Sequence, residues 1–138
     1  MEKWLGIDFG ERRIGFAIAL KETGLAFPRP FLDTKVEAEV IPYILSFCKE
    51  ERITNILIGM PYRTDGKPGK DIVVKKFIQE LSKATKLPIS TWNEAYSSVT
   101  AKEKTSHYST KKKQKQKGNI DSAAAAVVLQ EFLDFNLK

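Results

Sequence analysis

Residues 4–20 read Trp4-Leu5-Gly6-Ile7-Asp8-Phe9-Gly10-Glu11-Arg12-Arg13-Ile14-Gly15-Phe16-Ala17-Ile18-Ala19-Leu20. The pattern predicts two strands, Trp4–Phe9 and Ile14–Leu20, joined by a tight connection. In the second strand, bulky side chains alternate with glycine and alanine, so one face is bulky, the other is small, and both are apolar. Such a strand is typical of a sheet interior with helices packed on both faces.

The rest of the chain continues this pattern. Proline residues push a third strand to the edge of the sheet, helical spacing marks the helices, and β-branched apolar runs mark the buried strands. The elements expected are the edge strand within Gly24–Asp33, the helix Val36–Glu51, the strand Ile53–Met60, the helix Asp71–Ala84, the strand Pro88–Trp92 and the helices Tyr96–His107 and Asp121–Leu133. Hairpin strands followed by βα units predict an α/β fold with a mixed sheet and helices on both faces.

Length and composition limit the class of protein. The 138 residues suit a single domain, 1–138, and no apolar stretch is long enough to span a bilayer. The one cysteine, Cys48, cannot form an internal disulfide and is expected to be a buried small hydrophobe. The N-terminus lacks the layout of a signal peptide. We therefore expect a cytoplasmic protein.

Three acidic residues, Asp8, Glu94 and Asp121, each stand at the edge of an apolar segment. The strand before Glu94 is expected to lie beside the first strand, so the three would meet at one sheet edge. They would then form a carboxylate cluster without a protein cation beside it, which a metal ion must offset. Mg²⁺ or Mn²⁺ suits such oxygen ligands, and a carboxylate-held metal pair can cut a phosphodiester.

Each acid also has an ordinary structural explanation. Asp8 could cap the turn before Gly10, Glu94 could begin a helix, and Asp121 could be the N-cap of the last helix. These alternatives stay open at the level of the residues.

The basic residues favour a polyanionic partner. The chain has a net charge of +6, and five lysines crowd into a predicted solvated loop just before Asp121. At least one of Arg12 and Arg13 is expected to point toward the carboxylates. Trp92 is expected in the core, although stacking on a base is its alternative. The lysines are Lys111, Lys112, Lys113, Lys115 and Lys117.

These motifs together resemble the YqgF/RuvX family, RuvC-like members of the RNase H-like superfamily. The likeness rests on Gly6–Gly10 with Arg13–Ala17, on Ile58–Pro61 with Asp65-Gly66, and on Asp121–Ala125. It implies an RNase H-like fold with a five-stranded mixed sheet flanked by helices. It also implies a Mg²⁺- or Mn²⁺-dependent nuclease that processes the 5′ end of pre-16S rRNA in ribosomal precursor particles. In this mechanism Asp8, Glu94 and Asp121 hold the metal and perform catalysis, while Arg13, Ser97, Ser98 and the lysine run bind the nucleic acid backbone.

One segment departs from the family pattern. The family's Asp-Glu-Arg triplet is Asn93-Glu94-Ala95 here, so one anion and one fork-shaped phosphate donor are missing. Three other functions stay open: a Holliday junction resolvase acting on branched DNA, a non-catalytic nucleic-acid-binding module, and an actin-like ATPase that shares the opening motif. A chain of 138 residues has room for only one of the two lobes that an actin-like cleft needs. The sequence does not indicate whether the chain dimerises.

Overall fold

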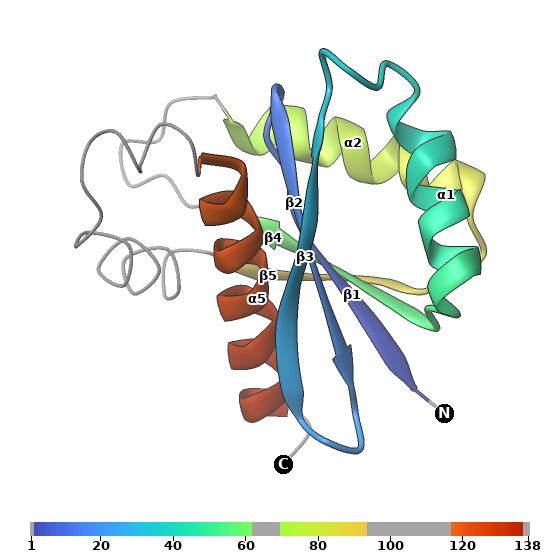
Figure 1. Cartoon of the computed structure of the whole chain (residues 1–138). Coiled ribbons are helices and arrows are strands. Elements are labelled where there is room, and N and C mark those ends of the chain that lie inside the picture. Colours follow the sequence, from blue (N-terminus) through green and yellow to red (C-terminus); the bar gives the residue numbers. More distant parts are fainter. Residues whose placement is uncertain (1, 62–69, 94–116, 137–138) are drawn as a thin grey trace.

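The computed structural model describes residues 2–61, 70–93 and 117–136. In these ranges the chain forms five strands and three helices (Figure 1). The strands are β1 (Lys3–Asp8), β2 (Arg13–Leu20), β3 (Leu25–Asp33), β4 (Asn55–Met60) and β5 (Ile89–Asn93), and the helices are α1 (Val40–Glu51), α2 (Lys70–Ala84) and α5 (Lys117–Asn136).

The strands form one sheet in the order β3-β2-β1-β4-β5. β2 pairs antiparallel with both β1 and β3, while β4 runs parallel to both β1 and β5. The predicted five-stranded mixed sheet is therefore confirmed. β3 lies at the edge, where Pro28 and Pro30 cost fewer ladder hydrogen bonds.

Helices cover both faces of the sheet, as predicted (Figure 1). Phe16 and Ile18 of β2 belong to the core formed with α1 and α2, and Ala17 and Ala19 belong to the core formed with α5. The bulky face of this strand thus meets two helices, and its small face lets a single helix approach closely. Cys48 is buried in the first core, as expected.

Two predictions about the site's framework were wrong. β5 does not lie beside β1, because β4 pairs with both and separates them. The last helix does not begin at Asp121, since α5 begins at Lys117 and Asp121 is its fifth residue, which also excludes the alternative that Asp121 is the N-cap. Lys117 is accordingly helical and not part of a loop. The remaining element boundaries agree with expectation or differ from it by at most four residues, and the predicted helix Tyr96–His107 lies outside the described residues.

None of the helices in the described ranges is both long enough and apolar enough to cross a membrane.

Candidate nuclease site

Asp8 is the last residue of β1 and lies on the face of the sheet that α5 covers. Side chains alternate along a strand, and a Cβ placed on Gly6 would meet Leu129 of α5 at 3.0 Å. On the other face, Phe9 stacks on Phe77 of α2, with ring centroids 4.3 Å apart. Asp8, two residues beyond Gly6, therefore shares the face of α5.

The N-terminal part of α5 lies directly against β2 at Gly15. A Cβ at Gly15 would overlap the carbonyl group of Asp121 and lie 2.6 Å from the amide nitrogen of Ser122. The Ser122 hydroxyl accepts a hydrogen bond from the Phe16 amide at 3.4 Å, and Ser122 is buried. The absence of a side chain at Gly15 is thus what allows the helix to approach.

Asp8 and Asp121 flank this same glycine. Asp8 is the cross-strand partner of Gly15, and paired residues in an antiparallel ladder have Cα atoms about 5 Å apart. Asp121 comes from the helix that lies on Gly15. The structure therefore gathers two of the three predicted acids around one point, although they lie 113 positions apart in the chain.

Arg13 pairs with Asp121. Its Nε lies 3.2 Å from Oδ2 of Asp121, and each side chain is 31% exposed. The prediction of a carboxylate cluster without a protein cation beside it was therefore wrong. An ion pair at this exposure contributes only about 0.2–1 kcal/mol to stability, so the guanidinium can leave the carboxylate for a phosphate at little cost. The expectation that one of the two arginines points toward the carboxylates is confirmed.

A cavity of about 350 Å³ opens beside Asp121. Its walls come from the β1–β2 connection, from α2 and from α5. They are formed by Phe9, Gly10, Glu11, Arg12, Arg13, Val73 and Asp121. Both arginines of the connection thus border a hollow that also contains a candidate metal ligand.

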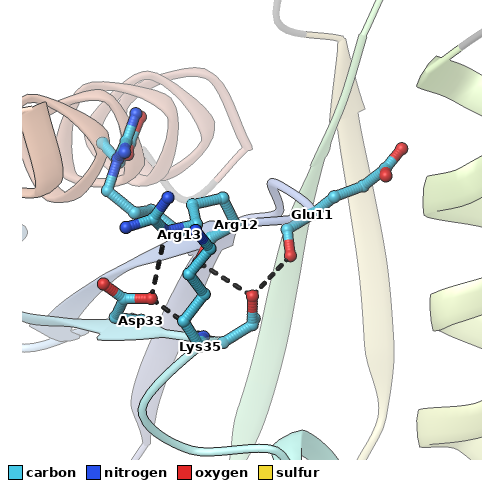
Figure 2. A network of polar contacts seen from close by, with 7 residues as sticks. Glu11, Arg12, Arg13, Asp33 and Lys35 are labelled. Carbon is cyan, nitrogen blue, oxygen red and sulfur yellow. Dashed lines mark hydrogen bonds and ion pairs between the residues drawn. The ribbon is translucent and has the colours of Figure 1, made fainter.

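The turn after β3 holds the β1–β2 connection in place (Figure 2). Thr34 donates from its amide to the Arg12 carbonyl at 2.8 Å and from its hydroxyl to the Glu11 carbonyl at 2.7 Å. Asp33 accepts hydrogen bonds from the Lys35 amide at 2.9 Å and from Nε of Arg12 at 3.3 Å. The Lys35 amide, together with the nearby arginines, lowers the pKa of the Asp33 carboxyl below its ordinary value.

Sequence reasoning missed this turn as part of the site. A usable signal was present, because an aspartate followed by threonine at the end of a strand is typical of a side-chain-stabilised turn. The partner of such a turn cannot be predicted from that signal, since Asp33 and Arg12 meet only after β2 and β3 have paired.

β5 brings the chain to the same end of the sheet. β1, β4 and β5 are parallel, so Asp8, Met60 and Asn93 end their strands at one edge, where sites in such folds form. Glu94 directly follows Asn93 but lies outside the described residues. Ser97, Ser98, Lys111, Lys112, Lys113 and Lys115 also lie outside them, as does the Lys117 side chain.

The chemistry of Asp8 and Asp121 suits a hard divalent cation, since both side chains offer carboxylate oxygens. Within the part of the chain that the structure describes, no three acidic, histidine or cysteine side chains form a group that could hold a metal. The two described acids could therefore supply only part of a ligand set, and the predicted third acid is Glu94.

Trp92 of β5 packs against α5, in keeping with the expectation of a core residue. Its ring meets Phe132 edge-on, with centroids 5.8 Å apart, and lies 5.5 Å from the ring of Phe135. Trp92 is partly buried against this core and also borders a separate cavity of about 550 Å³.

Comparison with known proteins places this fold and site in context. Residues 2–135 match the model of the RuvX family, described as Holliday junction resolvase. Relatives named putative pre-16S rRNA nuclease include one from Halothermothrix orenii, 32% identical over 97% of this chain and 96% of its own length. Another from Chloroflexus aurantiacus is 31% identical over 94% of this chain and 85% of its own length.

Solved structures show the same fold at low identity. Thermus thermophilus RuvC in complex with a Holliday junction aligns with a TM-score of 0.61 at 13% identity, covering 99% of this chain and 96% of that one. Fowlpox virus resolvase with junction DNA aligns with a TM-score of 0.60 at 12% identity, covering 99% of each chain. The fold is therefore that of the RuvC-like resolvases, and the chain belongs to the RuvX family.

Proposed function

We propose that this protein is a metal-dependent endonuclease that cleaves RNA, and that it processes the 5′ end of pre-16S rRNA. The observation that carries the proposal is the meeting of Asp8 and Asp121 at Gly15, with Arg13 beside them. The relatives named putative pre-16S rRNA nuclease, which match along nearly the whole chain, support the choice of RNA. The setting would be the ribosomal precursor particle in the cytoplasm.

In this proposal Asp8, Glu94 and Asp121 hold Mg²⁺ or Mn²⁺. The metal, when bound, supplies Lewis-acid activation of water and stabilises the negative charge that develops on the phosphate. Asp8 belongs to β1 and Asp121 to α5, so two separate elements hold these carboxylates, and Glu94 directly follows β5 in the sequence. Rigid strands and a helix hold such ligands more precisely than loops do.

Arg13 would hold the phosphate next to the carboxylates. Its pair with Asp121 keeps the guanidinium at the site before the substrate arrives. Bidentate contact with a phosphate would then replace the contact with Asp121, which is weak in an exposed pair. Ser97, Ser98 and the five lysines would contact the backbone of the bound strand, and these contacts position a nucleic acid without reading its sequence.

Cleavage of branched DNA is the second candidate. The family model is described as Holliday junction resolvase, and two solved resolvases bound to junction DNA share the fold. A non-catalytic nucleic-acid-binding module is the third candidate, because Asn93 and Ala95 replace the family's aspartate and arginine.

One experiment separates the three candidates. Purified protein is incubated with end-labelled pre-16S rRNA and with a DNA four-way junction, each with Mn²⁺ and with EDTA. Asp8→Asn removes the central anion and should abolish the metal-dependent cleavage. Asp134→Asn, the same exchange at an exposed position near the end of α5, is the matched control and should cleave like wild type.

We expect cleavage of the RNA with Mn²⁺ and none with EDTA. Cleavage of the junction alone would favour the resolvase. Binding of either substrate without cleavage by the wild-type protein would leave only the binding module. Cleavage that persists in Asp8→Asn would show that these carboxylates are not the catalytic centre.

A further inference from the structure

Arg12 borders the same cavity as Arg13 and Asp121 but faces a different partner. We propose that Arg12 is a second phosphate-contacting residue of this site and that Asp33 is its positioning residue. The proposal rests on the proposed nucleic-acid substrate, and it does not depend on cleavage.

The hydrogen bond to Asp33 uses only one nitrogen of the guanidinium. Nε of Arg12 lies 3.3 Å from Oδ1 of Asp33. Among the residues that the structure describes, no protein acceptor is hydrogen-bonded to the two terminal nitrogens of Arg12. The Arg12 side chain is 51% exposed. The guanidinium is thus fixed at one end and open to solvent at the other, where a phosphate can be bound.

Asp33 is itself fixed without help from the Arg12 side chain. Its Oδ1 accepts the Lys35 amide at 2.9 Å, and Thr34 ties the turn to the Arg12 carbonyl through both its amide and its hydroxyl, at 2.8 and 3.0 Å. The carboxylate therefore has a defined place before Arg12 reaches it. A fixed carboxylate reduces the number of orientations that the long Arg12 side chain can take, which lowers the entropy cost of binding a phosphate.

The two arginines serve different positions on the substrate. Arg13 pairs with Asp121 on the α5 side of β2, whereas Arg12 faces Asp33 in the turn after β3. Figure 2 shows the Glu11 side chain extending away from both guanidinium groups, although Glu11 also borders the cavity. Arg13 would therefore bind at the carboxylates, and Arg12 would bind a neighbouring phosphate of the same strand.

Only arginine can fill this role at position 12. Its guanidinium carries five N–H donors in a rigid fork, so Nε can serve Asp33 while the terminal nitrogens bind phosphate. A lysine ammonium is a point charge on a flexible stem and cannot be held at one atom and bind with another in fixed geometry. Replacement of Arg12 by lysine keeps the positive charge and removes the fork geometry, so it tests the two contributions separately.

The test is the binding of a fluorescent single-stranded RNA, measured by anisotropy in EDTA over a range of salt concentrations. Arg12→Gln should weaken binding about tenfold, as expected for loss of a charge-assisted hydrogen bond. It should also reduce the slope of log affinity against log salt by about 0.7, the value for one phosphate contact on a single strand. Arg12→Lys should show most of the affinity loss of Arg12→Gln, because the fork geometry is gone. It should keep most of the wild-type slope, because the positive charge remains.

Arg29→Gln is the matched control. Arg29 is 41% exposed, pairs with Glu51 at 2.7 Å and lies over the Phe47 ring of α1, away from the cavity. The Arg29→Gln variant removes the same charge as Arg12→Gln, but at a place outside the cavity. It should therefore leave the RNA affinity and the salt slope close to those of wild type. If Arg12→Gln and Arg29→Gln behave alike, Arg12 contributes only general positive charge and the proposal is wrong.

Asp33→Asn tests the positioning role. Asparagine keeps an oxygen for the Lys35 amide and removes the negative charge. If Asp33 only neutralised Arg12, this variant would bind RNA more tightly than wild type. We expect it to bind several-fold more weakly, with an unchanged slope, because the charge-assisted hydrogen bond that orients Arg12 becomes a weaker neutral one. Tighter or equal binding would refute the role of Asp33.

The outcome is separable from that of the proposed function. Wild-type protein that binds RNA through Arg12 but fails to cleave it with Mn²⁺ would overturn the nuclease and leave this assignment standing. Cleavage and binding that are both unaffected by Arg12→Lys would overturn the assignment alone. A wild-type protein that does not bind the RNA at all would overturn it as well.

Discussion

Replacing Gly15 by alanine tests the contact around which the site is built. The new Cβ would overlap the Asp121 carbonyl and lie 2.6 Å from the Ser122 amide nitrogen, whereas ordinary contacts begin at 3.4 Å. Peptide groups cannot rotate away as the end of a flexible side chain can. The N-terminal part of α5 must therefore retreat by at least about 0.8 Å, the difference between these two distances, and by more at the Asp121 carbonyl, which lies closer still to the new Cβ.

Two effects of different size should follow. Inserting a methyl group into a tightly packed contact costs about 1–3 kcal/mol, and we expect the upper end because the atoms it meets are backbone. In a chain of this size that corresponds to a fall in Tm of roughly 10 °C. Displacing a catalytic ligand by about 1 Å can cost roughly 100-fold in rate. Activity should therefore fall further than stability at a temperature where the variant is still folded.

The assay compares Gly15→Ala with Gly24→Ala, using thermal unfolding followed by single-turnover RNA cleavage at 20 °C below each variant's Tm. Gly24 has a φ of 66°, and no atom lies within 4 Å of the place that a Cβ would take, so alanine there strains the backbone without touching the site. That strain costs roughly 1–2 kcal/mol, which makes the variant a control for stability loss. If the two variants cleave equally well, the close packing of α5 on β2 at Gly15 does not position Asp121, and the reasoning fails.

Two further predictions concern parts of the framework away from the carboxylates. Gln130→Ala should lower the free energy of unfolding by about 1–3 kcal/mol in urea titrations, because it leaves the Gly24 carbonyl and the Ala26 amide without their side-chain partner; a change below 0.5 kcal/mol, the usual size for a surface substitution, would contradict this. Burial raises the pKa of the Cys48 thiol to about 11 from its ordinary 9.0, so the unfolded chain loses this proton at lower pH than the folded one and stability should decline between pH 9 and pH 11. The decline attributable to Cys48 is about 2–3 kcal/mol, measured as the difference between wild type and Cys48→Ala, and parallel pH profiles of the two proteins would refute it.

The layers of the fold could be predicted from the sequence because β2 carries the information in its side chains. Phe16 and Ile18 alternate with Ala17 and Ala19, and each set ended up in a different core. The edge position of β3 was predictable for a similar local reason, since proline lacks the amide that a central strand must donate.

Strand pairing and the start of the last helix were harder to predict, because neither follows from the local sequence of the segment concerned. Nothing within the segment 88–92 distinguishes a neighbour of β1 from a neighbour of β4, and only the assembled sheet decides it. The first four residues of α5, Lys117 to Ile120, lack an apolar stripe, so their helical state was not expected. Because of that extra turn, Asp121 lies within the helix and is not its N-cap.

The candidate site was predictable in its residue types and less so in its contacts. Asp8, Asp121 and Arg13 could be selected from motifs, but the pair between Arg13 and Asp121 joins residues 108 positions apart and arises only from the packing of α5 on β2. The hydrogen bond between Arg12 and Asp33 depends likewise on the pairing of β2 with β3.

The placement of Asp121 argues for function more strongly than its residue type does. As the fifth residue of α5 it cannot cap the helix, and its partly buried ion pair with Arg13 returns only about 1 kcal/mol. Packing of α5 elsewhere on this face does not require glycine, because β2 carries alanine at positions 17 and 19. Glycine is needed only where α5 comes closest to the sheet, and it costs roughly 0.5–1 kcal/mol relative to alanine in a strand. What this close approach achieves is the placement of a second carboxylate beside Asp8, which is the arrangement that a metal-dependent nuclease requires.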